Sequence, residues 1–105
     1  MLPFSKYHGL GNDFLILEGR HGQLPSAITD PDPAWVRQVC DRRFGIGGDG
    51  VILALPPQAE GDLRMRIFNA DGSEAEMCGN GIRCLARFLA DSDGNEPGFR
   101  WSIET

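Results

Sequence analysis

The residues with the clearest potential for chemistry lie in the segment NADGSEAEMCGNGIRC, which runs from Asn69 to Cys84. Cys78 stands where a predicted strand ends and a predicted helix begins. The first N–H groups of a helix have no partner within the helix, and the helix dipole adds about half a positive charge there. A thiol in that position ionises more easily, so the pattern predicts that Cys78 acts as a nucleophile or a base.

A simpler interpretation is that Cys78 is a small buried apolar residue. The glycines around it argue against this interpretation. Gly79 and Gly81 carry no side chain, which lets a substrate carboxylate approach the same helix amides. Each glycine in a helix interior also lowers helix stability by about 1 kcal/mol relative to alanine, and a core cysteine gains nothing in return. The flanking glycines therefore favour the reactive interpretation.

The other cysteines fit a structural role. Cys40 and Cys84 fall inside predicted helices, away from exposed N–H groups, and are expected in the core. Cys78 and Cys84 are six positions apart, which on a helix is about 9 Å of rise and roughly 240° of rotation, so they share neither a zinc ion nor a disulfide. The spacing opposes a metal site, and an odd count of three cysteines without an export signal predicts free thiols in the cytoplasm.

Two other features look functional but have simpler explanations. The loop Gly45–Gly50 has four glycines in six positions, yet it precedes a strand and no Gly-Lys-Ser/Thr follows. It matches neither the P-loop nor the dinucleotide fingerprint, so a plain turn is predicted. Asn12 and Asn69 stand beside glycine or alanine-aspartate, where turn asparagines are expected, and taken alone they predict turns.

Hydrophobic periodicity predicts the elements that must position these residues. Strands are expected at 4–8, 13–18, 51–55, 63–69, 74–77 and 99–104, and helices at 33–43 and 79–91. Turns at 9–12 and 70–73 make two hairpins, and 19–31 is expected to be a loop. Hairpins alternating with single helices predict an α+β fold, and 105 residues allow one core.

The composition of the chain limits the classes of binding partner that we expect. Ten basic residues face 15 acidic ones, a net charge of −5, which opposes binding to a nucleic-acid backbone. The longest apolar run, 51–55, is far shorter than the ~20 residues of a membrane-spanning helix, and the first residues do not resemble a signal peptide. We therefore expect no nucleic-acid partner and no membrane span.

Three segments, taken together and in order, resemble a known family. HGLGNDF at 8–14, DRRFGIGGDG at 41–50 and MRIFNADGSEAEMCGNGIRC at 65–84 are similar to the landmark segments of diaminopimelate epimerase, and the resemblance runs from residue 4 to the end. It implies a cofactor-independent epimerase that interconverts LL-2,6-diaminopimelate and meso-diaminopimelate on the route to lysine and peptidoglycan.

The family's fold has two similar α+β lobes, each a sheet wrapped around a central helix, with the small-molecule substrate between them. By this resemblance, residues 1–105 form the N-terminal lobe alone. The chain is then expected to be truncated, to lack the second lobe with its catalytic cysteine, and to be inactive by itself. The resemblance leaves open a homodimer.

The resemblance also implies roles for individual residues. Cys78 matches one of the two catalytic cysteines, and Gly79 and Asn80 match backbone and side-chain contacts to the substrate. Asn12 and Asn69 match amides that hold the distal end of the substrate. Gly50 departs from the pattern, because some members place a substrate-contacting glutamine there.

Two alternatives remain beside an epimerase fragment. One is a related cofactor-independent isomerase of the proline racemase or phenazine-isomerase type, which the NADG and HGLGN motifs disfavour because phenazine-type relatives lack the cysteine. The other is a non-catalytic half-protein that serves as an interaction module. The DNA sequence downstream of Thr105 would separate that alternative from the first.

Overall fold

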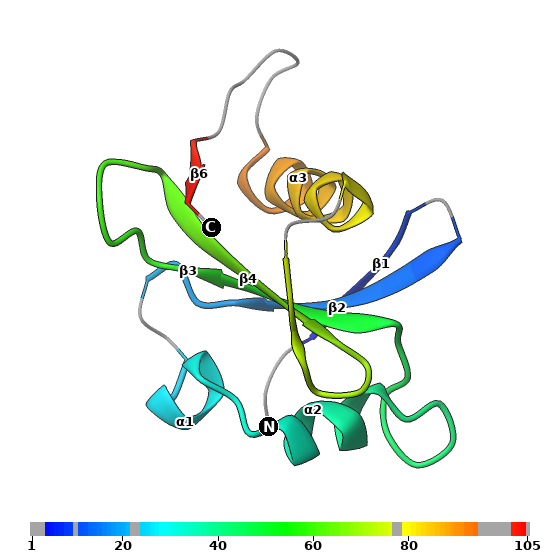
Figure 1. Ribbon diagram of the computed structural model, residues 1–105. Coiled ribbons are helices and arrows are strands. Elements are labelled where there is room, and N and C mark those ends of the chain that lie inside the picture. The colour runs from blue at the N-terminus through cyan, green and yellow to red at the C-terminus, as the bar shows by residue number, and fades with distance from the viewer. Residues whose placement is uncertain (1–3, 10, 22–23, 77–78, 95–101, 105) are drawn as a thin grey trace.

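A computed structural model describes the chain except for residues 1–3, 10, 22–23, 77–78, 95–101 and 105, and for Ser26, Ala27 and Gly79 it describes the backbone alone (Figure 1). Within the described residues, six strands form one sheet: β1 (Ser5–Gly9), β2 (Asn12–Glu18), β3 (Gly50–Leu55), β4 (Leu63–Asn69), β5 (Glu74–Ala75) and β6 (Ile103–Glu104). Three helices accompany it: α1 (Ser26–Thr29), α2 (Pro33–Cys40) and α3 (Gly79–Asp93). The predicted α+β class is confirmed.

The strand order is β1-β2-β3-β4-β5, and β6 pairs with β4. Three pairs are antiparallel, β1–β2, β3–β4 and β4–β5, whereas β2–β3 and β4–β6 are parallel. In this register Phe14 lies opposite Gly50, and Gly50 lies opposite Asn69. The start of β2, the start of β3 and the end of β4 therefore meet at one end of the sheet.

Side chains alternate between the two faces of the sheet, and each face has its own core. Helix α3 covers one face with four buried residues, Cys84, Leu85, Phe88 and Leu89. Helix α2 covers the other with Val36 and Cys40, and Figure 1 shows α1 on that side as well. Because both faces are covered, β3 is buried along its whole length, which explains its unbroken apolar run. Cys40 and Cys84 lie in these cores, as predicted.

Helix α2 starts at Pro33 as predicted, and the Asp32 carboxylate accepts a hydrogen bond from the Ala34 N–H at 2.8 Å. It ends at Cys40, not at residue 43 as expected. The reason is Asp41, whose carboxylate accepts hydrogen bonds from two following backbone N–H groups at 2.8 and 2.9 Å and so starts a new turn.

Several other boundaries differ from the predictions. Strands β1 and β2 extend into the predicted turn 9–12, β3 begins at Gly50, and residues 76 and 102 of the last two predicted strands lie outside β5 and β6. The expected loop at 19–31 contains the short helix α1, and α3 continues two residues further, to Asp93. Arg20 makes two parallel hydrogen bonds of 2.9 Å to the Asp93 carboxylate, which ties the end of the helix to the chain leaving β2. Residue 77 of the predicted strand 74–77 and residues 99–101 of the last predicted strand lie outside the described residues.

The turn between β4 and β5 packs closely against the start of α2, and a substitution at Gly72 tests this contact. Gly72 has φ +95, and a Cβ atom there would lie 2.6 Å from the Pro33 carbonyl oxygen at the start of α2. We expect Gly72→Ala to lower the free energy of unfolding by about 3 kcal/mol, from backbone strain and the clash together. Gly94→Ala is the matched control, because Gly94 has φ +64 but nothing within 4 Å of its Cβ position. Urea titrations showing equal losses for the two variants would contradict the proposed clash.

Candidate functional site

Two of the predicted site residues touch each other. Asn12 is the first residue of β2 and Asn80 is the second residue of α3. The Asn80 Nδ2 group donates a hydrogen bond of 2.9 Å to Asn12 Oδ1, across 68 positions of sequence, and the pair is partly buried. The fold therefore joins a strand and a helix at two side chains that the resemblance had assigned to one site.

Asn69, the last residue of β4, lies at the same end of the sheet. Phe14 and Ile67 both pack under α3, and Asn12 and Asn69 each lie two positions from one of them. Because side chains repeat every second residue in a strand, Asn12 and Asn69 are on the face that α3 covers. The Asn69 carboxamide donates to Ser73 Oγ at 3.0 Å, and no hydrogen bond between described residues joins it to Asn12 or Asn80.

Helix α3 begins at Gly79 and has 15 residues, so its first turn carries the positive end of a helix dipole. Gly9, at the end of β1, packs on the first two turns of α3: a Cβ atom there would lie 3.5 Å from the Asn80 carbonyl oxygen and 3.0 Å from Cys84 Sγ. Cys78 precedes Gly79 in the sequence and lies outside the described residues. The predicted reactivity of its thiol thus stays a prediction.

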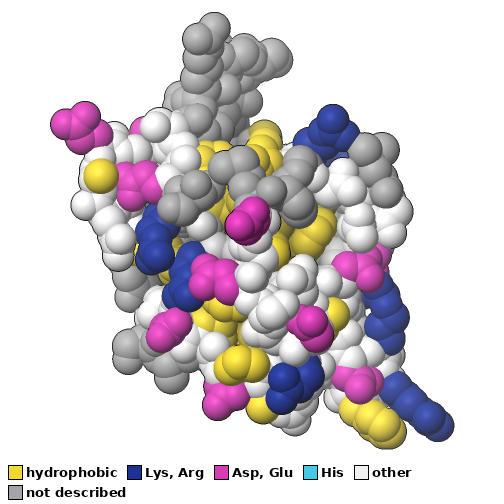
Figure 2. Space-filling model, in the orientation of Figure 1, with side chains coloured by type: hydrophobic (Ala, Val, Ile, Leu, Met, Phe, Trp, Pro, Cys, Tyr) yellow, Lys and Arg dark blue, Asp and Glu magenta, His cyan; other side chains and the backbone are white. Residues whose placement is uncertain are grey.

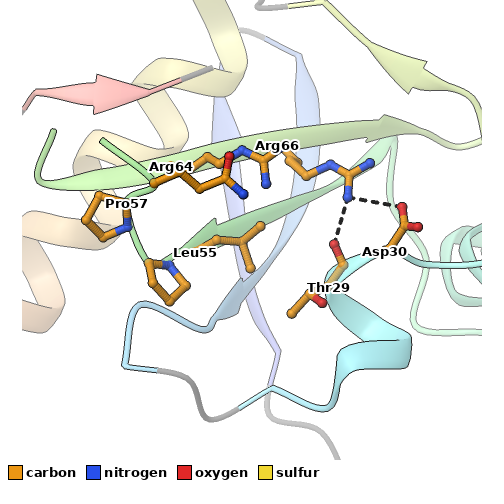
Figure 3. A pocket seen from close by; sticks show the side chains of 8 residues that line it. Thr29, Asp30, Leu55, Pro57, Arg64 and Arg66 are labelled. Carbon is orange, nitrogen blue, oxygen red and sulfur yellow. Dashed lines mark hydrogen bonds and ion pairs between the residues drawn. The ribbon is translucent and has the colours of Figure 1, made fainter. Parts of the chain in front are cut away.

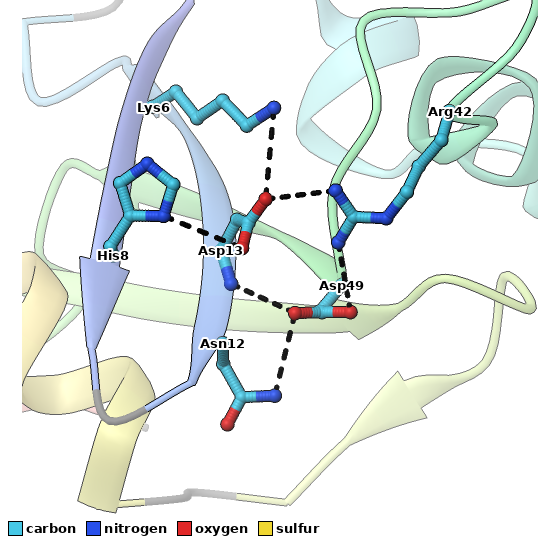
Figure 4. A network of polar contacts seen from close by, with 6 residues as sticks. All are labelled: Lys6, His8, Asn12, Asp13, Arg42 and Asp49. Atoms are coloured by element: carbon cyan, nitrogen blue, oxygen red, sulfur yellow. Dashed lines mark hydrogen bonds and ion pairs between the residues drawn. The ribbon is translucent and has the colours of Figure 1, made fainter.

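A network of charged groups lies next to Asn12 (Figure 4). The Asp49 carboxylate accepts hydrogen bonds through Oδ2 from the Asp13 backbone N–H at 2.8 Å and from Asn12 Nδ2 at 3.5 Å. Arg42 joins the two carboxylates, with Nη1 at 2.9 Å from Asp13 Oδ2 and Nη2 at 3.2 Å from Asp49 Oδ1. One arginine thus pairs with two carboxylates beside a predicted site residue.

The same contacts keep both acids ionised. The hydrogen bond from the Asp13 N–H, with help from Arg42, holds the pKa of the Asp49 carboxyl below its ordinary value. Arg42 likewise lowers the pKa of Asp13, and Lys6 and His8 add to this from 3.7 and 3.4 Å. Both acids remain hydrogen-bond acceptors at neutral pH.

Asp13, Asp49 and Arg42 are not among the predicted site residues. All three stand in segments that were noticed for other reasons, 8–14 and 41–50. A carboxylate close to glycines at the start of a strand was the signal that could have found Asp13 and Asp49, whereas Arg42, which follows α2, carries no such signal. Asp13 lies 29 positions from Arg42 and 36 positions from Asp49, so sequence spacing alone does not reveal these contacts.

The glycine-rich loop is a turn, as predicted. The five successive N–H groups of residues 45–49 donate to backbone oxygens of Asp41, Val39, Cys40 and Asp13, at 2.8 to 3.1 Å. None of these five is left to cradle a phosphate. At Gly50, a Cβ atom would lie 2.6 Å from the Phe68 carbonyl oxygen, so this backbone has no room for the side chain that some family members carry.

A pocket of about 410 Å³ lies elsewhere, at the far end of β3 and β4, lined in part by Leu55 and Arg64 (Figure 3). Arg66 on its wall is already paired with Glu74 at 2.8 Å and with Asp30 at 3.1 Å. The Asn12–Asn80 contact is at the other end of these strands, so this pocket is separate from the predicted site.

The described residues contain no group of three or more His, Cys, Asp or Glu side chains placed to hold a metal ion. Among these residues, no helix combines the length and the apolar character that crossing a membrane requires. On the face seen in Figure 2, basic and acidic side chains are interspersed.

Comparison with known proteins gives a consistent result. A family model described as diaminopimelate epimerase matches residues 4–100. The diaminopimelate epimerase of Prochlorococcus marinus (strain MIT 9313) is 70% identical over 105 residues, which are 100% of this chain and 35% of that protein. The Synechocystis enzyme of the same name (strain ATCC 27184 / PCC 6803 / Kazusa) is 63% identical over 95 residues, 90% of this chain and 33% of that protein.

Among solved structures, a predicted epimerase from Pseudomonas aeruginosa superposes with a TM-score of 0.70 at 18% identity, over 99% of this chain and 35% of that one. At this identity the match shows a shared fold. The chain spans about a third of the length of the relatives it matches.

Proposed function

The chain belongs to the diaminopimelate epimerase family, and from that membership we propose that it forms the N-terminal lobe of an enzyme that interconverts LL-2,6-diaminopimelate and meso-diaminopimelate. The observation that carries this proposal is the 70% identity, along the entire chain, to a relative of that name. The contact between Asn12 and Asn80 supports it, because it joins two of the residues that the resemblance assigns to the substrate.

The proposed mechanism needs two thiols and no cofactor. An α-proton of an amino acid is a very weak acid, so inversion requires a base on one face, a proton donor on the other and stabilisation of the carbanion. Cys78 serves one face, and a cysteine of the second lobe serves the other. The start of α3 at Gly79 supports this arrangement, because the helix end contributes positive potential without a metal.

Asn12, Asn69, Gly79 and Asn80 are proposed to bind the substrate. Diaminopimelate carries two carboxylates and two ammonium groups, which pair with different partners. Carboxamide oxygens accept hydrogen bonds from ammonium groups, and carboxamide and helix N–H groups donate to carboxylates. Residues placed together at one end of a sheet and the start of a helix offer both kinds of partner.

The proposed enzyme also has a second lobe. The relatives are about three times as long as this chain, which supports a second lobe in the same polypeptide that closes over the substrate. We further propose that the protein is cytoplasmic, in line with its odd number of cysteines, and that it forms a homodimer.

A chimera tests the proposal. Residues 1–105 are joined to the remainder of the Prochlorococcus marinus enzyme, whose own first third is 70% identical to this chain, so most contacts between the lobes are retained. We expect the chimera to convert LL- to meso-diaminopimelate within about tenfold of the natural enzyme's rate, because most substitutions away from a site change stability or binding little. Chiral chromatography measures the conversion.

The same chimera separates the alternatives. L-Proline offered in place of diaminopimelate should stay unchanged, and its racemisation would favour the proline racemase type of function. A folded chimera that inverts neither amino acid, next to an active natural enzyme, would favour the non-catalytic interaction module.

A further inference from the structure

The carboxamide of Asn12 is held from both sides. Its oxygen accepts a hydrogen bond of 2.9 Å from Asn80 Nδ2, and its nitrogen faces Asp49 Oδ2 at 3.5 Å. A carboxamide has an acceptor at one end and two donors at the other. A carboxylate next to the nitrogen and an N–H donor next to the oxygen therefore define one orientation of Asn12.

Asp49 is itself held in place by stronger contacts. Its Oδ2 accepts the Asp13 N–H at 2.8 Å, and its own backbone N–H donates to the Asp13 carbonyl oxygen at 2.8 Å. On the other side, Arg42 Nη2 lies 3.2 Å from Asp49 Oδ1. The carboxylate thus has a defined position before any substrate arrives.

We propose that Asp49 is a positioning residue, which orients the carboxamide of Asn12 for substrate, and that Arg42 in turn orients Asp49. The inference rests on the proposed function, in which Asn12 holds the distal end of the substrate. Because the carboxamide is oriented in advance, less conformational freedom is lost when substrate binds. Asp49 acts through Asn12 and does not touch the reacting carbon.

A purely structural role for Asp49 makes a different prediction. An acid that only caps the Asp13 N–H would change the stability of the lobe and the amount of folded enzyme, and KM would be unaffected. An acid that orients Asn12 changes substrate affinity, and KM rises while kcat changes less.

Kinetics of the chimera distinguish the two roles. We expect Asp49→Ala to raise KM about tenfold, the loss that corresponds to one good hydrogen bond, with kcat within about threefold of the parent. Asp49→Asn should raise KM by only about threefold, because its oxygen can take the place of Oδ2 while its NH2 group cannot accept the Arg42 hydrogen bond. Should Asp49→Ala not fold, Arg42→Gln is the second variant, with an expected rise in KM of about threefold because Asp49 keeps its Asp13 contact.

Asp41→Ala is the matched control. The Asp41 carboxylate also accepts two backbone N–H groups, from Arg43 and Phe44, in the same segment of the chain, but its bonds are made within its own turn and not to Asn12. This variant should leave KM unchanged. A KM that rises equally in Asp41→Ala and Asp49→Ala would overturn the positioning role, as would an unchanged KM in a folded Asp49→Ala chimera.

NMR of the 105-residue chain gives a readout that does not depend on activity. Asp49→Ala should move the Asn12 side-chain ¹H–¹⁵N signals toward those of a solvent-exposed asparagine, and Asp41→Ala should not. Unmoved Asn12 signals would refute the inference. An inactive parent chimera would contradict the proposed function, while these signals still decide whether Asp49 orients Asn12.

Discussion

Replacing Cys78 by alanine in the chimera is expected to lower kcat for epimerisation by roughly 10³-fold or more, the usual contribution of a positioned acid or base. Substrate affinity should change much less, because Asn12, Asn69 and the helix N–H groups remain. Chiral chromatography measures the rate, and isothermal titration measures binding. The expected pattern is a protein that binds diaminopimelate and does not invert it.

Cys40→Ala is the control for this variant. Cys40 is buried against the opposite face of the sheet, in the core formed with α2. Its loss should lower the free energy of unfolding and leave kcat unchanged. A Cys78→Ala chimera with the parent rate would show that Cys78 is not the catalytic base.

Heavy water gives the same mechanism a second readout. A thiol exchanges its proton rapidly with solvent, so the donor that reprotonates the α-carbon carries deuterium. The parent chimera should therefore place deuterium at the centre it inverts, as mass spectrometry of the product would show. Product with hydrogen at that centre would mean that the original proton is carried across, which a two-thiol mechanism does not allow.

The 105-residue chain by itself is expected to show no measurable inversion, at least about 10³-fold below the chimera. The reason is stereochemical: in the proposed mechanism a single thiol lies on one face of the α-carbon, and inversion requires a proton on the other face. The assay is the same chromatography, with the chain and the chimera purified in parallel. Inversion by the chain alone, lost in its Cys78→Ala variant, would contradict the need for a second lobe.

Local sequence patterns anticipated most of the secondary structure. The strand predicted at 63–69 is β4, in which Leu63, Met65 and Ile67 are buried and the two arginines between them are partly exposed, and the strand predicted at 51–55 lies within β3, which is buried throughout. The helix predicted at 79–91 is α3, and Ile82, Leu85 and Leu89, which are at helical spacing, pack on the sheet. These features depend on side chains close in sequence, so their periods can be read without the fold.

The helix ends were less predictable, because they depend on particular hydrogen bonds. Asp41 ends α2 by accepting N–H groups from the residues that follow it. Asp93 extends α3 because Arg20, 73 positions earlier, binds its carboxylate. A hydrophobic period contains no information about such partners.

The predicted site can be divided in the same way, into residues that local sequence predicts and contacts that only the fold creates. Sequence alone predicts Cys78 and Gly79 as site residues from their local context, and the resemblance adds Asn12, Asn69 and Asn80 to that prediction. Nothing in the spacing placed Asn12 against Asn80 and Asp49, or Arg42 against Asp13. Those contacts depend on the parallel pairing of β2 with β3 and on the way α3 crosses the sheet. Asp13 and Asp49 are 36 positions apart in the sequence, and Asn12 and Asn80 are 68 positions apart. Only the tertiary structure brings such distant residues within hydrogen-bonding distance.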